Sequence, residues 1–414
     1  MNIEICLNEF TQLWNNAPND FISVTNEISI EEKLKREEGL IRFSKAIQNE
    51  VDLKKMDVLD RQRFVEQFKE SFGLFFKNSF SFSNTETAII SDSGFVNITK
   101  EFMLMARRFD PEVNMNDVFQ ASRNLWIINS LQIMMDAPVK LTPSIFAYSM
   151  LYPYSDNYLD DPSISSSEKK AFSDRFRQRL NGEHVLPANN MEQTIFDLVA
   201  LIEEDWDRNQ FPEVYESLLA IHDAQTKSIG LINANSVMPD EDLLSICIEK
   251  GGTSVLADGY LINGTLTPEQ QMFCFGFGAF LQFVDDIQDI KDDMNDRLNT
   301  FFIASAKKKQ LDHLVNKTFW FGQQVMSDLS CFSSRNLAQM SSLMIKSNNF
   351  LLTEAVGLNN EYYPKAFIDK LECFSPFRFE FIRKRRSNLE SNRISLMKKI
   401  GSFVFDEAEM AMQA

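Results

Sequence analysis

The sequence contains few of the residues that interrupt regular structure or that bind metals through nitrogen and sulfur. Its 414 residues include 14 glycines, 12 prolines, 3 histidines and 5 cysteines. Scarce glycine and proline disfavour a fold of many short strands joined by tight turns. The cysteines are scattered without a CxxC pair, which argues against a disulfide framework and a structural zinc site. The few histidines make a multi-histidine metal site improbable.

The sequence also has no excess of positive charge and no long apolar run. Because 42 Lys and Arg stand against 59 Asp and Glu, the formal net charge is −17 and nucleic acid is not expected as a partner. The first ten residues, MNIEICLNEF, have neither the basic region nor the continuous apolar core of a secretory signal. No run of about 18 apolar residues occurs, so no transmembrane segment is expected. We expect a cytoplasmic protein.

Bulky apolar residues, by contrast, are abundant, with 37 phenylalanines and 18 methionines. Together with the scarcity of turn residues, this composition predicts an all-α protein with an aromatic-rich interior. We expect residues 96–400 to form a single large helical bundle and residues 1–95 to form an N-terminal helical extension.

Local patterns predict where several helices begin and end. Thr142-Pro143 supplies a polar cap and a proline at the first helical position, opening a helix towards Asp160. Residues 240–262 form another predicted helix, interrupted by Gly251-Gly252. The capping box from Thr267 to Gln270 opens a helix that we expect to reach about Met294.

Two clusters of aspartates stand out in this helical pattern. The first lies at the predicted C-terminal end of a helix and contains Asp156, Asp160 and Asp161. Side chains four residues apart lie one turn apart on the same face, so Asp156 and Asp160 repel each other unless a cation lies between them. A single acidic cluster is usually a solvated helix face, and the two interpretations are evenly balanced for this one.

The second cluster places Asp285, Asp289 and Asp293 at i, i+4 and i+8, with Gln282 one turn earlier and Asp286 beside them. The neighbouring residues are apolar, so a solvated helix face is a less natural interpretation here. A buried acidic stripe requires a counter-charge.

The donor types in both clusters predict the ligand. Carboxylate oxygens without His or Cys suit Mg²⁺, which commonly binds through one or two carboxylates, waters and substrate phosphates. Two such clusters on separate helices can hold Mg²⁺ from opposite sides of a diphosphate. The sequence therefore predicts ionisation or transfer of a diphosphate ester.

At these residues the sequence resembles the class I isoprenoid synthase superfamily of trans-prenyltransferases, squalene/phytoene synthases and class I terpene cyclases. The second cluster fits the pattern Q-x-x-D-D-x-x-D-x-x-x-D of the second prenyltransferase motif at every position. The first cluster reads D-x-x-x-D-D, which is more similar to the first motif of squalene synthases. The resemblance extends over about residues 115–300, and it implies a helical bundle of that superfamily's type.

Lys250-Gly251-Gly252-Thr253 resembles the Lys-Thr-Gly kink of prenyltransferases, in which the lysine binds diphosphate and the helix break exposes backbone groups. A tight contact between two helices explains the glycines equally well.

Departures from the family pattern bear on the subclass. The first motif is followed by residues 162–168, PSISSSE, without the Arg-Arg pair of chain-elongating enzymes. Chain elongation is therefore disfavoured, and the high phenylalanine content suits a cyclase, whose carbocations are stabilised by aromatic faces. A squalene/phytoene-like or chain-elongating prenyltransferase is the alternative, and a non-catalytic helical protein that binds metal or prenyl lipid is a second one.

The resemblance implies a role for each candidate residue in a Mg²⁺-dependent terpene cyclase, a carbon–oxygen lyase acting on a linear prenyl diphosphate. Asp156, Asp160, Asp285 and Asp289 are the expected catalytic metal ligands, with Asp161, Asp286 and Asp293 as further metal-binding residues. Lys250 is a further expected catalytic residue and binds diphosphate, with support from Lys227, Arg378 and Gln282. A homodimer and a peripheral contact with a membrane stay open as partners, as does the basic run at residues 383–386.

Overall fold

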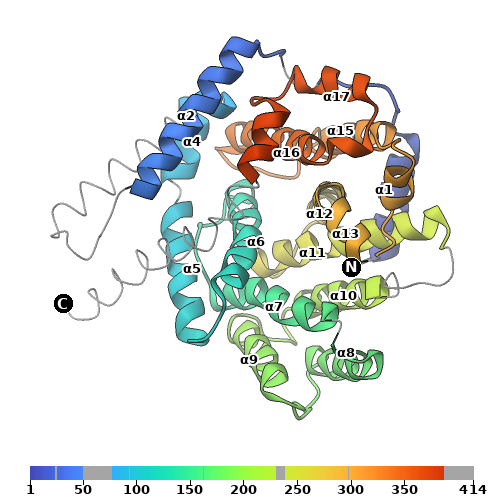
Figure 1. Cartoon of the computed structure of the whole chain (residues 1–414). Coiled ribbons are helices and arrows are strands. Elements are labelled where there is room, and N and C mark those ends of the chain that lie inside the picture. Colours follow the sequence, from blue (N-terminus) through green and yellow to red (C-terminus); the bar gives the residue numbers. More distant parts are fainter. Residues whose placement is uncertain are drawn as a thin grey trace. The chain divides into compact units, whose positions relative to one another are not determined.

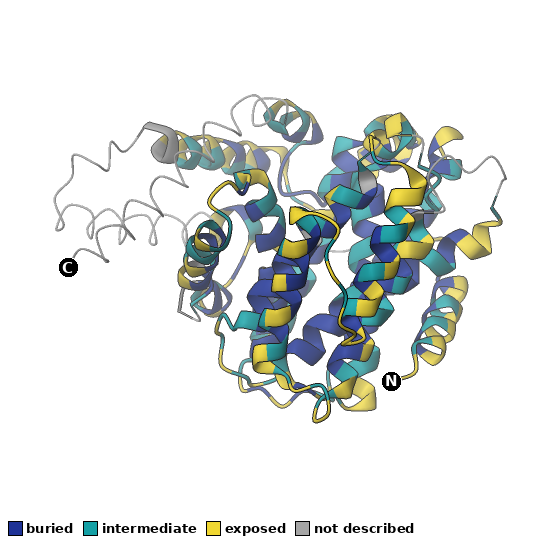
Figure 2. Cartoon of the chain, turned by 90° about the horizontal axis from the view of Figure 1, so that it is seen from below, coloured by how far each residue is buried: buried dark blue, intermediate teal, exposed yellow. Residues whose placement is uncertain are grey.

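The computed structural model of the chain describes residues 1–23, 26–49, 77–92, 94–161, 163–229, 238–296 and 298–386. Within these ranges the secondary structure is helical and contains no β-strand, which confirms the predicted all-α class. Most helices bury one face and expose the other (Figure 2). None of the described helices is long and apolar enough to cross a membrane.

The chain divides into two compact units that are interleaved along the sequence. Unit 1 comprises residues 1–22, 117–335 and 361–363, and unit 2 comprises residues 23–116, 336–360 and 364–414. The predicted boundary at residue 95 is therefore not where the chain divides. The first helix belongs to unit 1, and the C-terminal segments join most of the predicted extension in unit 2.

Unit 1 contains both aspartate clusters, which lie on helices labelled in Figure 1 as α7 (Pro143–Asp160), α12 (Pro268–Gln288) and α13 (Ile290–Asp296). Its helix α11 packs along α12 and, on another side, along α10, while α7 packs against α9. The helices of unit 1 are α1 (Ile3–Asn16), α6 (Met115–Met134), α7 (Pro143–Asp160), α8 (Ser166–Leu180), α9 (Asn190–Asp205), α10 (Pro212–Ile229), α11 (Asp240–Asn263), α12 (Pro268–Gln288), α13 (Ile290–Asp296), α14 (Ile303–Lys307) and α15 (Asp312–Val325).

The cap residues predicted from the sequence begin two of these helices. The Thr142 side chain accepts a hydrogen bond from the backbone N–H of Ile145 and is followed by Pro143 at the start of α7. Thr267 and Gln270 form the expected capping box at the start of α12. Both predictions are confirmed, because a cap satisfies backbone donors locally whatever the tertiary contacts.

Helix α11 continues without a break through its two glycines, so the predicted interruption at Gly251-Gly252 is wrong. The glycines allow a close approach instead. A Cβ atom on Gly251 would collide with the backbone carbonyl of Gly278, and one on Gly252 would collide with the Phe275 ring. The pair therefore serves a tight contact between α11 and α12, the second interpretation of the motif.

Helix α12 also differs from its prediction, since it ends at Gln288 rather than near Met294. Asp289 forms the C-cap, with φ −96° and ψ 7°, and its N–H still bonds to the Asp285 carbonyl. The chain then starts the short helix α13. The four aspartates of the second cluster (Asp285, Asp286, Asp289 and Asp293) consequently lie around a helix end rather than along one straight helix.

An aromatic cluster attaches α1 to unit 1. The Phe10 ring stacks on Phe275 with centroids 5.9 Å apart, and Trp14 lies 4.4 Å from Phe283. Lys317 of α15 donates a hydrogen bond to the Trp14 carbonyl at 3.0 Å. Burial of two large aromatic residues on one helix face explains why α1 belongs with α12 and α15 rather than with a separate extension.

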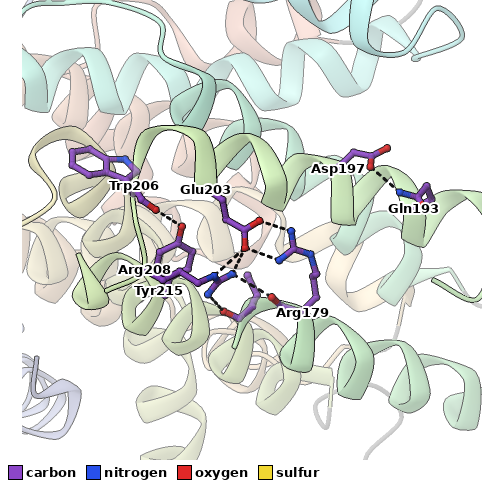
Figure 3. Close-up of polar contacts among 8 residues, drawn as sticks. Arg179, Gln193, Asp197, Glu203, Trp206, Arg208 and Tyr215 are labelled. Atoms are coloured by element: carbon purple, nitrogen blue, oxygen red, sulfur yellow. Dashed lines mark hydrogen bonds and ion pairs between the residues drawn. The ribbon is translucent and has the colours of Figure 1, made fainter. Parts of the chain in front are cut away.

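A network of arginines and one glutamate joins α8, α9 and the loop before α10 (Figure 3). Both oxygens of Glu203 are within 2.7 Å of the Arg179 guanidinium, and Arg208 binds the same carboxylate at 2.7 and 2.9 Å. Arg208 also covers the Tyr215 ring, 3.8 Å from its centroid. Charges in this part of unit 1 are thus well matched.

Among the residues that the structure describes, unit 2 includes the helices α2 (Ile30–Asn49), α4 (Asn84–Asp92), α5 (Phe95–Phe109), α16 (Leu337–Leu358) and α17 (Lys365–Glu372). Two buried glutamates are paired there, Glu37 with Arg378 at 2.6 Å and Glu86 with Lys346 at 2.8 Å. These pairs link the C-terminal segments to residues near the start of the unit.

Candidate active site

The acidic residues of the second cluster gather where α12 ends and α13 begins. Asp285 and Asp286 occupy the last turn of α12, Asp289 caps it, and Asp293 lies one turn further on, in α13. Of the four, Asp286 is buried and the others are half-buried. A charged group at this position is held by ordered backbone rather than by a loop.

Asp286 points towards α11. Its carboxylate accepts hydrogen bonds from Gln282 Nε2 at 2.7 Å and from the Cys247 thiol at 3.1 Å. Burial, together with the charge of Asp285, raises the pKa of Asp286 to about 6, although these donors and Lys250 oppose the shift. Gln282 thus acts on Asp286, and Lys250 lies close enough to influence it.

Asp293 has an environment dominated by other acids. Burial raises its pKa to about 7, and the charges of Asp286, Asp289 and Asp285 add to the shift. A hydrogen bond from Thr300 Oγ1 at 3.3 Å opposes it. The helix end therefore brings together carboxylates that raise one another's free energy when ionised.

One cation from another helix reaches the cluster directly. Arg123 of α6 forms an ion pair with Asp285 at 3.2 Å. Its side chain is 67% exposed, so the pair is screened by solvent and contributes little to stability. Such a pair can open without a large cost when a stronger ligand for Asp285 is present.

The first cluster is less uniform. Asp156 on α7 is only 9% exposed and accepts a hydrogen bond from Gln225 Nε2 of α10 at 2.7 Å. Asp161 follows α7 and turns to the N–H of Ser163, which lowers the pKa of the Asp161 carboxyl. The side chain of Asp160 lies outside the described residues.

Two of the predicted diphosphate-binding cations have acidic partners. Lys227 of α10 binds both oxygens of Glu249 on α11, at 2.6 and 2.8 Å. Arg378 belongs to unit 2, where it pairs with Glu37. Among the predicted cations, Lys250 is the one whose charge acts on the second cluster.

The donor set fits Mg²⁺. Within the described ranges, no three His, Cys, Asp or Glu side chains already form a metal-binding group. Mg²⁺ does not require one, because it commonly uses one or two carboxylates and completes its shell with waters and substrate phosphates. Asp285 and Asp289, four residues apart at the end of α12, provide such a pair.

Sequence reasoning missed several residues of unit 1 whose contacts depend on the fold. Arg123 and Cys247 contact the second cluster from α6 and α11. Asp258, on α11, is wholly buried and accepts a hydrogen bond from Asn124. The one available signal for Asp258 was an isolated carboxylate within an otherwise largely apolar stretch, VLADGYL, at residues 255–261.

Comparison of the chain with models of known protein families and with curated proteins finds no match to either.

Proposed function

We propose that the chain is a Mg²⁺-dependent isoprenoid synthase of the class I type. It ionises a linear prenyl diphosphate, and we favour a cyclase, in which the resulting carbocation closes into a ring. The observation that carries this proposal is the group of four carboxylates at the end of α12, next to Lys250 of α11. A site with carboxylates and a lysine on adjacent helices suits a metal and an anionic substrate together.

The residues of this site have different proposed roles. Asp285 and Asp289 would hold the metal, and Lys250 would bind diphosphate oxygens. Asp286 is a positioning residue, because the hydrogen bond that it accepts from Cys247 fixes the end of α12 against α11, and Gln282 of the same helix orients its carboxylate. Bound Mg²⁺ supplies electrostatic stabilisation of the departing diphosphate.

Asp156 is the described residue of the first cluster best placed to take part, since it is buried and held by α10. Lys250 is better placed than Lys227 or Arg378, because its charge acts on Asp286 of the second cluster. We favour a cyclase over a condensing enzyme because the Arg-Arg pair of chain-elongating enzymes is missing and phenylalanine is abundant.

The test is Mg²⁺-dependent release of diphosphate from C10, C15, C20 and C25 prenyl diphosphates, with analysis of the organic products. We expect one substrate to give a cyclic hydrocarbon or alcohol. The Asp285→Ala/Asp289→Ala variant should lose at least about 100-fold in rate, since both proposed metal ligands are removed.

The matched control is Asp292→Ala/Asp296→Ala, which removes two exposed carboxylates of α13 and therefore changes the net charge by the same amount. It should retain wild-type turnover. A product of doubled carbon number would replace the cyclase by a squalene/phytoene-like enzyme. Absence of diphosphate release from every substrate, with and without isopentenyl diphosphate, would refute the proposed function.

A further inference from the structure

A second polar group lies within the helices of unit 1, away from the two aspartate clusters. Asp258 of α11 is 0% exposed. Its Oδ1 accepts a hydrogen bond from Asn124 Nδ2 of α6 at 3.0 Å, and the same Nδ2 lies 3.4 Å from Ser149 Oγ of α7. Among the described residues, Asp258 Oδ2 has no hydrogen-bond partner.

The surroundings of Asp258 connect it to the candidate active site. Tyr148 of α7 donates a hydrogen bond to the Ser254 carbonyl of α11 at 2.9 Å. Burial raises the pKa of Tyr148, and the charges of Asp258 and Asp156 raise it further, so this side chain lies near both acids. The charge of Asp258 also acts on Cys274 of α12. Four helices that carry or adjoin the aspartate clusters therefore meet around this carboxyl.

Asp258 also has a defined place along α11. It follows Lys250 by eight residues on a continuous helix, which corresponds to about 12 Å along the axis. If Lys250 binds the diphosphate, Asp258 lies at the depth of the prenyl chain rather than of its charged head.

The protonation state follows from the contacts. A wholly buried carboxylate without a cationic partner is strongly destabilised, so burial raises the pKa of Asp258 well above its ordinary value. Oδ1 already serves as an acceptor, which leaves Oδ2 to carry the proton. A carboxylic acid kept neutral by an apolar site can serve as a proton donor at neutral pH. A purely structural buried acid would normally have both oxygens satisfied.

We propose that Asp258 exchanges a proton with the hydrocarbon part of the bound prenyl chain. Oδ2 delivers its proton to one carbon of a double bond, whose π electron pair forms the new C–H bond and leaves a carbocation on the other carbon. The Asp258 carboxylate later takes a proton from a carbon next to the cation, and that C–H electron pair forms a new double bond. The acid is regenerated, so the step needs no further reactant.

This inference rests on the proposed function, and isotope labelling tests it separately. Protein equilibrated in D₂O is given the prenyl diphosphate that the wild type ionises, with Mg²⁺ in excess. Deuterium in the organic product is then measured per diphosphate released. We expect solvent deuterium at carbon in the wild-type product and loss of that label in Asp258→Asn. The control Asp205→Asn, the same change on exposed Asp205 of α9, should keep the label.

The possible failures are distinct. A wild type that releases no diphosphate refutes the proposed function and this inference with it. A wild type that releases diphosphate but incorporates no deuterium, or an Asp258→Asn variant that keeps the label, refutes this inference alone.

A second readout needs no turnover. At neutral pH, infrared spectra of the resting protein should contain a C=O stretch from the protonated carboxylic acid of Asp258, whose pKa is raised by burial. The band should disappear in Asp258→Asn and persist in Asp205→Asn. Its absence from the wild type, or its persistence in folded Asp258→Asn, would overturn the assignment of the proton to Asp258.

Discussion

Two parts of unit 1 hold carboxylates in opposite electrostatic settings. Around α8 and α9, Glu203 is bound by Arg179 and Arg208. Burial alone would raise the pKa of Glu203, but these two arginines lower it overall. At the end of α12, burial and acidic neighbours raise the pKa of Asp293 to about 7. Both regions are helical and half-buried, and only the second one concentrates like charges.

The difference separates structural from functional charge. A fold can neutralise a buried carboxylate with arginine, and this chain does so at Glu203 and again at Glu192, which Arg175 binds at 2.9 Å. Keeping like charges together at the end of α12 lowers stability, and the function proposed above accounts for this cost through a Mg²⁺ ion that would bind there.

Removing the acid from the matched network should have the largest effect on stability. Glu203→Gln leaves Arg179 and Arg208 facing a neutral amide, and we expect the free energy of unfolding to fall by about 2 kcal/mol, allowing for partial exposure. Urea unfolding at neutral pH measures it. Glu204→Gln, on the exposed neighbour, should stay within about 0.5 kcal/mol of the wild type. Equal effects of the two variants would contradict the comparison.

Removing an acid from the end of α12 should have the opposite sign. The folded-state pKa of Asp293 lies above its unfolded value, so ionisation opposes folding at high pH and this cost is relieved as the pH falls from about 7 to about 4. We expect Asp293→Asn to raise the free energy of unfolding by about 1–2 kcal/mol at pH 8, with the gain shrinking towards pH 4.

Urea unfolding across this pH range gives the measurement, and Asp292→Asn on the exposed neighbour is the control. A destabilised Asp293→Asn at pH 8 would show that the carboxylate is satisfied rather than strained by its neighbours.

Adding a cation should reduce the contrast between the regions. Mg²⁺ with inorganic diphosphate, at a few times the dissociation constant, should stabilise the wild type by about 1 kcal/mol and diminish the advantage of Asp293→Asn. Thermal unfolding with and without both ligands measures the shift. Glu203→Gln should retain it, whereas Asp285→Ala/Asp289→Ala should not. The same shift in all three proteins would place the bound ions elsewhere.

The features of the fold that were predictable from the sequence depend on neighbouring residues. Composition predicted the all-α class, and the cap residues at Thr142 and Thr267 marked where α7 and α12 begin. The prediction of a helix break at the glycine pair of α11 was wrong, because a glycine in a helix can mark either a break or a close contact with another helix. The decisive partner, Gly278, lies on another helix.

The candidate site shows the same limit. Spacing within one helix indicated the carboxylates of α12, since side chains four residues apart share a face. The partners of these residues depend on how separate helices meet, as the Arg123–Asp285 and Lys227–Glu249 pairs show. The isolated Asp258 has no partner nearby in the sequence, and only the fold brings Asn124 to it.

The docking of α1 has a consequence for how the protein is made. Trp14 and Lys317, which are joined by a hydrogen bond, are 303 residues apart in the chain. At about 5–20 residues per second, a ribosome takes roughly 15–60 s to synthesise the intervening segment. Throughout that time, the aromatic face of α1 has none of its α15 partners. Helix α1 thus leaves the ribosome well before the segment that covers its aromatic face, which makes it a natural target for chaperones acting during translation.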